Sequence, residues 1–314
     1  MEGCSDALKR QKLTEIFTKI NLGEIPAIST HVQEVLVLTL KKQVTAEEVA
    51  AAILKDYSLT NKVLQVVNSA YYIRGVPITS VERAVAALGI DLIRELTVSI
   101  SLIEEFFRSG GEKDSLSKLL ALSLVSANLS KALAQKYAPA VSPEEAYLGA
   151  LLHDLGRLVI TLYFPEIARR IALAREAGSS EEAMCRLMLK QLTFNEIGAE
   201  VACFWNFSET LIACMESVPP KPESPTDTLP LLQNLALLAN LLTRTVCEGE
   251  PLQPVMARFK PLFPLELPLL LNTCLQIADR VGGVSGVIRY GLTRLKFRSK
   301  LLTAMKTCRD QPLS

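Results

Sequence analysis

Apolar residues recur at helical spacing along most of the chain, whereas the alternating pattern of a half-buried strand is scarce. Several apolar segments follow a Thr that stands three residues before a Glu, which is the spacing of a capping box at a helix N-terminus. These pairs are Thr45 with Glu48, Thr79 with Glu82, and Thr193 with Glu196. The pattern therefore predicts an all-α fold.

The segment AYLGALLHDLGRLVI at residues 146–160 has the most complete start signal. Ser142 can cap a helix, Pro143 suits its first turn, and Glu145 can return a bond to the cap. The apolar run then contains His153 and Asp154 side by side. Neighbouring helix residues point about 100° apart, so both side chains can serve one site only at a helix end or kink. The glycine at position 156 favours such a break.

Three stretches lack helical periodicity and divide the chain: residues 109–115, 218–230 and 251–268, the last two with five prolines each. The expected organisation has an N-terminal helical block packed on a second helical bundle, with a helical C-terminal extension. Its parts are an N-terminal helix at 1–20, the block at 21–110, the bundle at 114–218, and an extension at 219–314 that ends in a basic tail.

Composition narrows the class of protein. The formal net charge is +1, which gives no general reason to expect nucleic acid as a partner. The seven Cys residues include no C-x-x-C pair, so neither a zinc ribbon nor a redox motif is indicated. No run of 18 uncharged apolar residues and no signal peptide pattern occur, and LPLLQNLALLANLL is typical of a buried helix. We therefore expect a soluble, cytoplasmic protein.

The His153–Asp154 pair raises the question of a metal site. A divalent ion usually takes three or four protein ligands, and the pair supplies two. The other histidine of the chain, His31, lies far upstream. The residues alone favour a structural role, in which the helix C-terminus favours protonated His153 and Asp154 accepts backbone N–H bonds or pairs with Arg157.

Four segments resemble the HDOD domain, the HD-related output domain of bacterial signalling proteins. They are EIPAIS, AAAILKDYSLTNKVLQVVNSAYY, PITSVERAVAALGI and AYLGALLHDLGRLVI, and the resemblance covers roughly residues 21 to 245. It implies the helical fold of the HD phosphohydrolase superfamily, with residues 21–218 as the domain. HDOD proteins are generally regarded as non-catalytic members that serve signal transduction.

The resemblance also implies that the metal chemistry is lost. The positions at which active HD enzymes bring further ligands correspond here to Leu122, Phe194, Val218, Pro219 and Asn240. The first four cannot ligate a metal through their side chains, and Asn is a poor replacement for a carboxylate. We therefore expect His153 and Asp154 to be a vestigial pair, with no metal and no cofactor.

A second candidate surface follows the predicted helix that ends near residue 70. Asn68 and Ser69 either cap that helix end or line a groove for a ligand or peptide. Tyr71, Tyr72 and Arg74 form an aromatic and basic cluster of a kind that interfaces favour, although a loop that packs on its own domain is more common.

The basic tail is a run of seven cations without an acid: Arg289, Arg294, Lys296, Arg298, Lys300, Lys306 and Arg309. Charge runs usually form the solvated face of a helix. In that interpretation Leu292, Leu295, Leu302 and Met305 dock the helix on the body of the protein. The alternative is an anionic partner: a lipid surface, an RNA or an acidic protein.

These observations favour a regulatory protein that binds a protein partner without turning over a substrate. The partner classes that remain open are a sensor kinase, a response regulator and a cyclic-nucleotide enzyme, and a small ligand between the helical blocks also stays open. One alternative is a degenerate phosphohydrolase for a nucleotide or cyclic dinucleotide, with a single metal on His153 and Asp154. Nucleic-acid binding through residues 289–309 is a weaker alternative.

Overall fold

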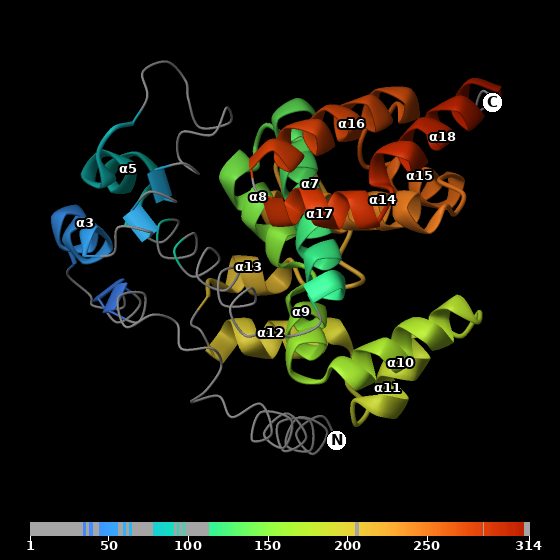
Figure 1. Ribbon diagram of the computed structural model, residues 1–314. Helices are drawn as coiled ribbons and strands as arrows, with labels where there is room; N and C mark the ends of the chain where they lie inside the picture. The colour runs from blue at the N-terminus through green and yellow to red at the C-terminus, as the bar shows by residue number, and fades with distance from the viewer. Residues whose placement is uncertain are drawn as a thin grey trace. The chain divides into compact units, whose positions relative to one another are not determined.

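The structure, a computed structural model, describes residues 34–35, 38–39, 44–55, 59–60, 63–64, 78–90, 93, 97, 113–204, 207–284 and 286–310. Every regular element in these ranges is an α-helix, so the all-α prediction is confirmed (Figure 1). The chain divides into two compact units, residues 1–110 and 111–314.

In the first unit, α3 (Ala46–Leu54) and α5 (Val81–Leu88) pack on each other. Thr45 and Glu48 close the predicted capping box at the start of α3. The prediction for α5 is wrong by one residue, because the Ser80 hydroxyl, not Thr79, accepts the Arg83 N–H. The helix stops at Gly89, whose φ of 85° is costly for any residue with a Cβ.

Several predictions fall on parts of this unit that lie outside the described residues. They concern the N-terminal helix at 1–20, His31, and the candidate surface of Asn68, Ser69, Tyr71, Tyr72 and Arg74.

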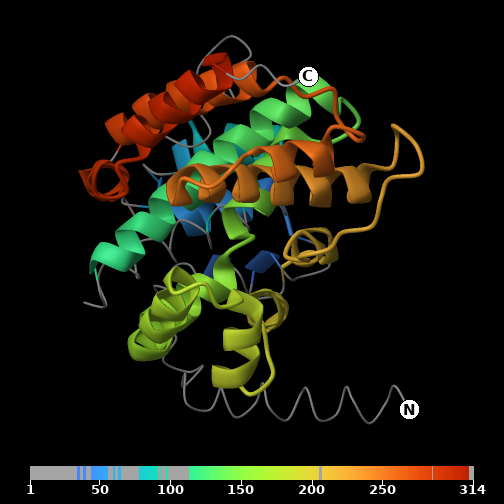
Figure 2. The same ribbon diagram turned by 90° about the vertical axis from the view of Figure 1, so that its right-hand side faces the viewer.

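The core of the second unit is built by α7 (Lys113–Tyr137), α8 (Pro143–Leu152) and α14 (Thr228–Glu248). The 25-residue α7 begins inside the predicted loop 109–115 and runs beside α14 (Figure 2). Ser126 and Thr243 join these two helices through a buried 2.7 Å hydrogen bond. Among the described helices, α7 is long and apolar enough to cross a membrane, but 72% of its apolar window is buried in the fold.

A second layer carries the candidate site. In it α9 (Leu155–Tyr163) crosses α12 (Phe194–Phe204), while α10 (Pro165–Glu176) and α11 (Glu181–Met188) form a hairpin. The short α13 (Glu209–Ala213) packs on α12 and α8. Gly156 and Gly198 allow the α9–α12 crossing, because a Cβ at position 156 would lie 1.9 Å from the Phe194 carbonyl oxygen.

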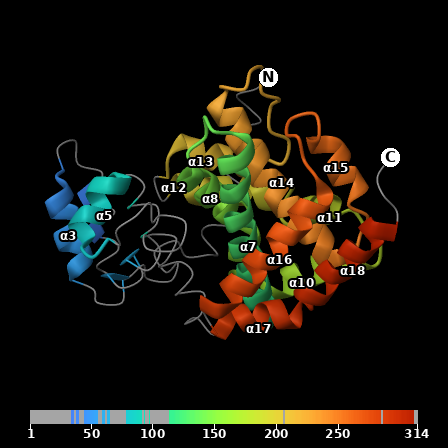
Figure 3. The ribbon, with the colours of Figure 1, turned by 90° about the horizontal axis from the view of Figure 1, so that it is seen from above.

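The C-terminal helices are α15 (Gln253–Phe259), α16 (Leu267–Val284), α17 (Gly286–Arg294) and α18 (Phe297–Asp310). They belong to the same compact unit as α7–α14, and Figure 3 shows α16 and α17 beside α7. Gly291 allows α17 to lie close to α7, because a Cβ at this position would be 2.2 Å from the Ser117 carbonyl oxygen.

Two of the predicted loops are shorter than expected. The stretch 218–230 ends where α14 begins at Thr228, and 251–268 contains all of α15 and the start of α16. Pro230, Pro254 and Pro268 lie in the first turns of these helices. Proline is tolerated there because the first-turn N–H groups have no partner within the helix.

The basic tail forms two helices rather than one, and its most deeply buried residues are not the ones predicted to dock it. The buried residues are Ile288, Phe297 and Leu301, whereas Leu302 is 38% exposed. Leu292, Leu295 and Met305 are half-buried. The pattern of buried residues differs from that of a single helix because the helix is interrupted at Leu295–Lys296, where Lys296 has a φ of 52°.

Candidate functional site

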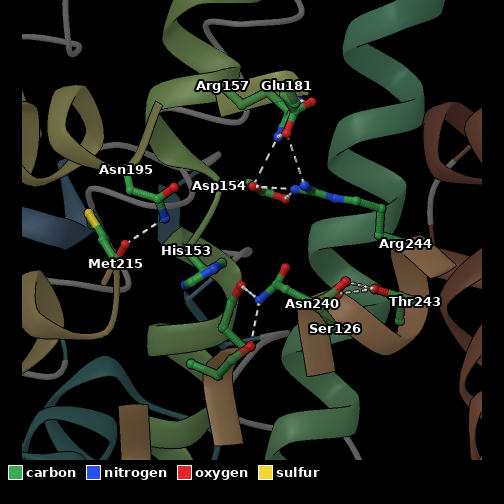
Figure 4. Close-up of polar contacts among 12 residues, drawn as sticks. Ser126, His153, Asp154, Arg157, Glu181, Asn195, Met215, Asn240, Thr243 and Arg244 are labelled. Atoms are coloured by element: carbon green, nitrogen blue, oxygen red, sulfur yellow. Dashed lines mark hydrogen bonds and ion pairs between the residues drawn. The ribbon is translucent and has the colours of Figure 1, made fainter. Parts of the chain in front are cut away.

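His153 and Asp154 lie at the break between α8, which ends at Leu152, and α9, which begins at Leu155. The break lets both side chains reach one pocket of about 210 Å³, lined in part by α9, α11, α12 and α14. Figure 4 shows the Asp154 carboxylate directed at Arg244 rather than at the His153 ring. The two residues thus share a pocket but have different partners.

His153 is buried and bonded to the backbone. Its Nδ1 lies 2.6 Å from the Cys214 carbonyl oxygen, which can only accept, so Nδ1 carries the hydrogen. Burial lowers the pKa of His153, although Asp154 and the Cys214 carbonyl oppose this shift. Burial therefore favours the neutral imidazole, contrary to the prediction that the helix end favours the protonated form.

Asp154 is held by two arginines. Arg244 Nη2 from α14 donates to both carboxylate oxygens, at 2.8 and 3.0 Å. The predicted partner Arg157 also contributes, with its Nε 3.5 Å from Oδ1. Burial by itself would raise the pKa of Asp154, but the charges of Arg244 and Arg157 hold it below its ordinary value. Asp154 is therefore an ion-paired carboxylate.

Glu181, the first residue of α11, closes the group. Arg157 donates to its two oxygens, both at 2.7 Å, and Arg244 Nη1 lies 3.4 Å from Oε2. Burial opposes ionisation, but the bond and charge of Arg157 lower the pKa of Glu181 to about 2. Asp154, Arg157, Glu181 and Arg244 thus form a closed ring of alternating charges, which we name the arginine–carboxylate cluster.

Phe194 has a specific role in this cluster. The Arg157 guanidinium carbon lies 4.5 Å from the centre of the Phe194 ring, which is a cation–π contact. Phe194 stands at a position where the family resemblance implies a histidine in active enzymes. At this position the chain therefore has an aromatic ring that contacts a cation of the protein itself.

Asn240 also has a structural role in place of the expected carboxylate. Its Nδ2 donates to the Ala150 carbonyl oxygen at 3.0 Å and to the Ala236 carbonyl oxygen at 2.9 Å. The first bond ties α14 to the last turn of α8, just before the His–Asp pair. An aspartate could not donate these bonds, so the amide suits helix packing rather than metal binding.

The remaining positions implied by the resemblance also lack donors. Leu122 is half-buried on α7, Val218 is 77% exposed, and Pro219 is buried. In the described part of the chain, no group of three or more His, Cys, Asp or Glu side chains could hold a metal ion. The donor set beside His153 therefore does not fit a divalent metal, because its carboxylates are already bound by arginines.

Three residues of the site were not predicted from the sequence: Arg244, Glu181 and Asn195. Arg244 had a detectable signal, since it is a lone cation in an apolar helix that is otherwise predicted to be buried. Glu181 resembled an ordinary first-turn acid after the cap Ser180. Asn195 lines the pocket and donates to the Met215 carbonyl oxygen at 2.6 Å, a contact between segments distant in sequence.

The basic tail is partly engaged within the fold. Arg294 Nε donates to Asp114 at 2.7 Å, Arg298 Nε to Asp279 at 3.0 Å, and Lys300 to the Cys247 carbonyl oxygen. Lys296 and Lys306 are exposed, and the Arg309 side chain lies outside the described residues. The tail therefore both docks on the body and presents cations to solvent.

Comparisons with known proteins agree with this fold. An uncharacterized protein of Treponema pallidum is 22% identical over 261 residues, and the match covers 81% of this chain but only 49% of the relative. The chain thus spans about half the length of that relative.

Two crystal structures have the same fold at low identity. The first, from Shewanella amazonensis, carries a provisional name as a phosphohydrolase; it is 21% identical with a TM-score of 0.59 and covers 90% of this chain and 98% of its own. The second, from Marinobacter aquaeolei, carries a provisional name as a signal transduction protein; it is 17% identical with a TM-score of 0.57 and covers 93% of this chain and 66% of its own. Residues 25–218 match the HDOD domain, and we conclude that the chain belongs to the HDOD family.

Proposed function

We propose that the chain is a non-catalytic regulatory protein that acts by binding a protein partner. The observation that carries this proposal is the pairing of Asp154 with Arg244, at 2.8 and 3.0 Å. A catalytic HD site would need that carboxylate for a metal ion. Here a guanidinium of the protein occupies its oxygens instead.

Electrostatics favours this arrangement over a metal ion. A divalent cation bound to His153 and Asp154 would lie close to Arg244 and Arg157, whose charges repel it in a poorly solvated pocket. Displacing Arg244 would leave a partly buried arginine without its main carboxylate partner, which is costly. The Phe194 ring supplies no donor that could compensate.

Metal analysis together with hydrolysis assays tests the proposal. The purified chain would be incubated with manganese, iron, nickel or magnesium, desalted and measured by mass spectrometry of the metal. Nucleotides and cyclic dinucleotides would serve as substrates. We expect substoichiometric metal that is unchanged in His153→Ala, and no turnover. Stoichiometric metal that disappears in His153→Ala, together with turnover, would overturn the proposal.

A matched variant sharpens this test. If Arg244 is the group that excludes the metal, Arg244→Met should bind more metal than the wild type, because Asp154 then loses its main cation. Arg175→Met is the control, since Arg175 contacts Glu181 at 3.8 Å but has no contact with Asp154. Equal metal binding by both variants would contradict the role assigned to Arg244.

A degenerate phosphohydrolase remains the second candidate, and one observation favours it. His153 donates Nδ1–H to a backbone carbonyl, which is the arrangement that commonly orients a metal-binding histidine through its other nitrogen. The phosphohydrolase name of the Shewanella structure belongs to that protein, at 21% identity. The same metal and hydrolysis measurements decide between the two functions.

The class of protein partner can be tested directly. The sequence leaves a sensor kinase, a response regulator and a cyclic-nucleotide enzyme open. Affinity purification of the tagged chain from its native cells, with the bound proteins identified by mass spectrometry, would choose among them. Recovery of a member of one of these classes by the wild type but not by a surface variant would support the proposal.

A further inference from the structure

A groove of about 570 Å³ lies between α16, α17 and α18, separate from the His153 pocket. Its apolar lining comes from Ala278, Leu292, Phe297 and Leu302. Ala278 and Phe297 are buried, Leu292 is half-buried, and Leu302 is 38% exposed. The groove therefore has an apolar floor that is partly open to solvent.

The rim of the groove is cationic. Arg289, Lys296 and Arg298 line it together with a single acid, Asp279. Arg298 pairs with Asp279 at 3.0 Å, and Arg289 Nε donates to the Gly282 carbonyl oxygen. Neither Arg289 nor Lys296 has an acidic partner among the described residues. Positive charge thus remains beside the apolar floor.

Lys296 stands in an unusual backbone conformation. Its φ is 52°, in the left-handed region, at the turn between α17 and α18. Glycine is the ordinary residue at such a helix end, because a side chain costs about 1 kcal/mol there. An exposed cation therefore stands at this position on the rim of the groove, despite the backbone cost.

We propose that this groove binds an acidic amphipathic helix of a protein partner. Apolar side chains on one face of that helix would cover Leu292 and Leu302, and its carboxylates would pair with Arg289 and Lys296. This is the helix-in-groove mode of recognition, with charge complementarity at the rim. The inference rests on the proposed partner-binding function and specifies the chemical character of the partner's binding segment.

The lining favours a peptide over a nucleic acid. Single-stranded nucleic acids are usually bound by exposed aromatic rings that stack on bases along a cationic track. Phe297, the aromatic residue in this lining, is fully buried. Two cations without acidic partners are also few for a phosphate backbone, whereas they match the carboxylates of one or two helical turns.

Fluorescence anisotropy with a designed peptide tests whether the groove binds an acidic amphipathic helix. The probe is a fluorescein-labelled peptide of roughly 18 residues, long enough to form a helix, with Leu and Glu on opposite faces. We expect saturable binding to the full chain. The double variant Arg289→Glu, Lys296→Glu should bind at least about tenfold more weakly, because two rim charges are reversed.

A matched control distinguishes binding in the groove from general attraction of the peptide to positive charge. Lys306→Glu makes the same kind of change on the exposed side of α18, outside the groove, and should weaken binding less than about twofold. Lys296→Gly is a second groove variant that removes one cation and relaxes the backbone. It should fold at least as well as the wild type while binding more weakly.

Several results would overturn the inference. They are the absence of saturable peptide binding, an equal loss in Lys306→Glu, and tighter binding of a peptide with Lys in place of Glu. Tighter binding of single-stranded RNA or of vesicles with anionic lipid would also reject it. So would a dimer of this chain that only the groove variants dissociate. None of these results changes the metal measurements, so this inference can fail while the non-catalytic function stands.

Discussion

The arginine–carboxylate cluster and the C-terminal groove are both rich in arginine, but their charges are used differently. In the cluster, Arg157 and Arg244 are each bound to carboxylates of the same fold. In the groove, Arg289 and Lys296 have no acidic partner among the described residues. A cationic pocket is therefore a candidate binding site for an anionic partner only where the fold leaves its charges unneutralised.

Burial determines how much the ion pairs of each region contribute to stability. The Arg244 and Asp154 side chains are 24% and 15% exposed, whereas Arg298 and Asp279 on the groove rim are 64% and 53% exposed. Water screens the exposed pair and leaves it with little net stabilisation. The cluster is only partly solvated, so losing one partner there leaves a charge that is poorly compensated. The two regions should therefore respond very differently to equivalent substitutions.

The largest contrast in stability is expected between alanine substitutions at two glycines. Gly156→Ala should destabilise the protein by about 3 kcal/mol or more, because the new Cβ would meet backbone atoms of α12. Gly282→Ala, on the groove, should be neutral or stabilise by roughly 0.5 kcal/mol, since its Cβ would only touch Leu292. Urea unfolding measures both values. Equal stability of the two variants would show that the α9–α12 crossing is not tightly packed.

The next contrast concerns two aspartates that pair with arginine. Asp154→Ala should cost roughly 2–3 kcal/mol, somewhat less than breaking a fully buried pair, because the cluster is partly solvated. Asp279→Ala should cost about 0.5 kcal/mol or less, as is usual for an exposed pair. Thermal unfolding of both variants checks this. A cost for Asp279→Ala as large as that for Asp154→Ala would contradict the distinction between the regions.

Acid should weaken the cluster in a defined pH window. The folded pKa of Glu181 is about 2, below its ordinary value of 4.5. The unfolded chain therefore binds more protons between these values, and stability falls with falling pH. The stabilisation from Glu181 is fully present above about pH 4.5 and is lost towards pH 2.

Comparison of the wild type with Glu181→Gln at several pH values measures this effect. The difference in unfolding free energy should be largest near neutral pH and should shrink below about pH 4.5. A difference that stays constant down to pH 2.5 would mean that the Glu181 charge contributes nothing. Glu182→Gln is a suitable control, because that neighbouring side chain is 66% exposed.

The smallest expected effect concerns the backbone strain at Lys296, on the rim of the groove. Lys296→Gly should raise the free energy of unfolding by up to about 1 kcal/mol, because glycine adopts the left-handed conformation without strain. Lys306→Gly should instead lower it by roughly 1 kcal/mol, since position 306 lies inside α18. Opposite signs for the two variants would support a strained Lys296, whereas equal destabilisation would contradict it.

Local signals in the sequence predicted the helices well. The capping boxes at Thr45 and Thr193 form as expected, and Ser142 with Pro143 starts α8. These features depend on residues a few positions apart, so their physics is contained in the local sequence. The first-turn prolines misled the loop assignment because the same residue type ends helices and begins them.

The sequence by itself determined the helical class, the family, and the shortage of metal donors beside His153. The tertiary structure alone decided the ion pairs beside His153, because Arg244 lies 90 positions from Asp154 and contacts it only when α14 packs near α9. Glu181, 27 positions from Asp154, joins the same cluster through Arg157 and Arg244. The tertiary structure likewise decided the direction of the pKa shift of His153, since burial is its largest cause and lowers the pKa. Long-range packing sets both the partners and the solvation of a charge, and neither is encoded at local spacing.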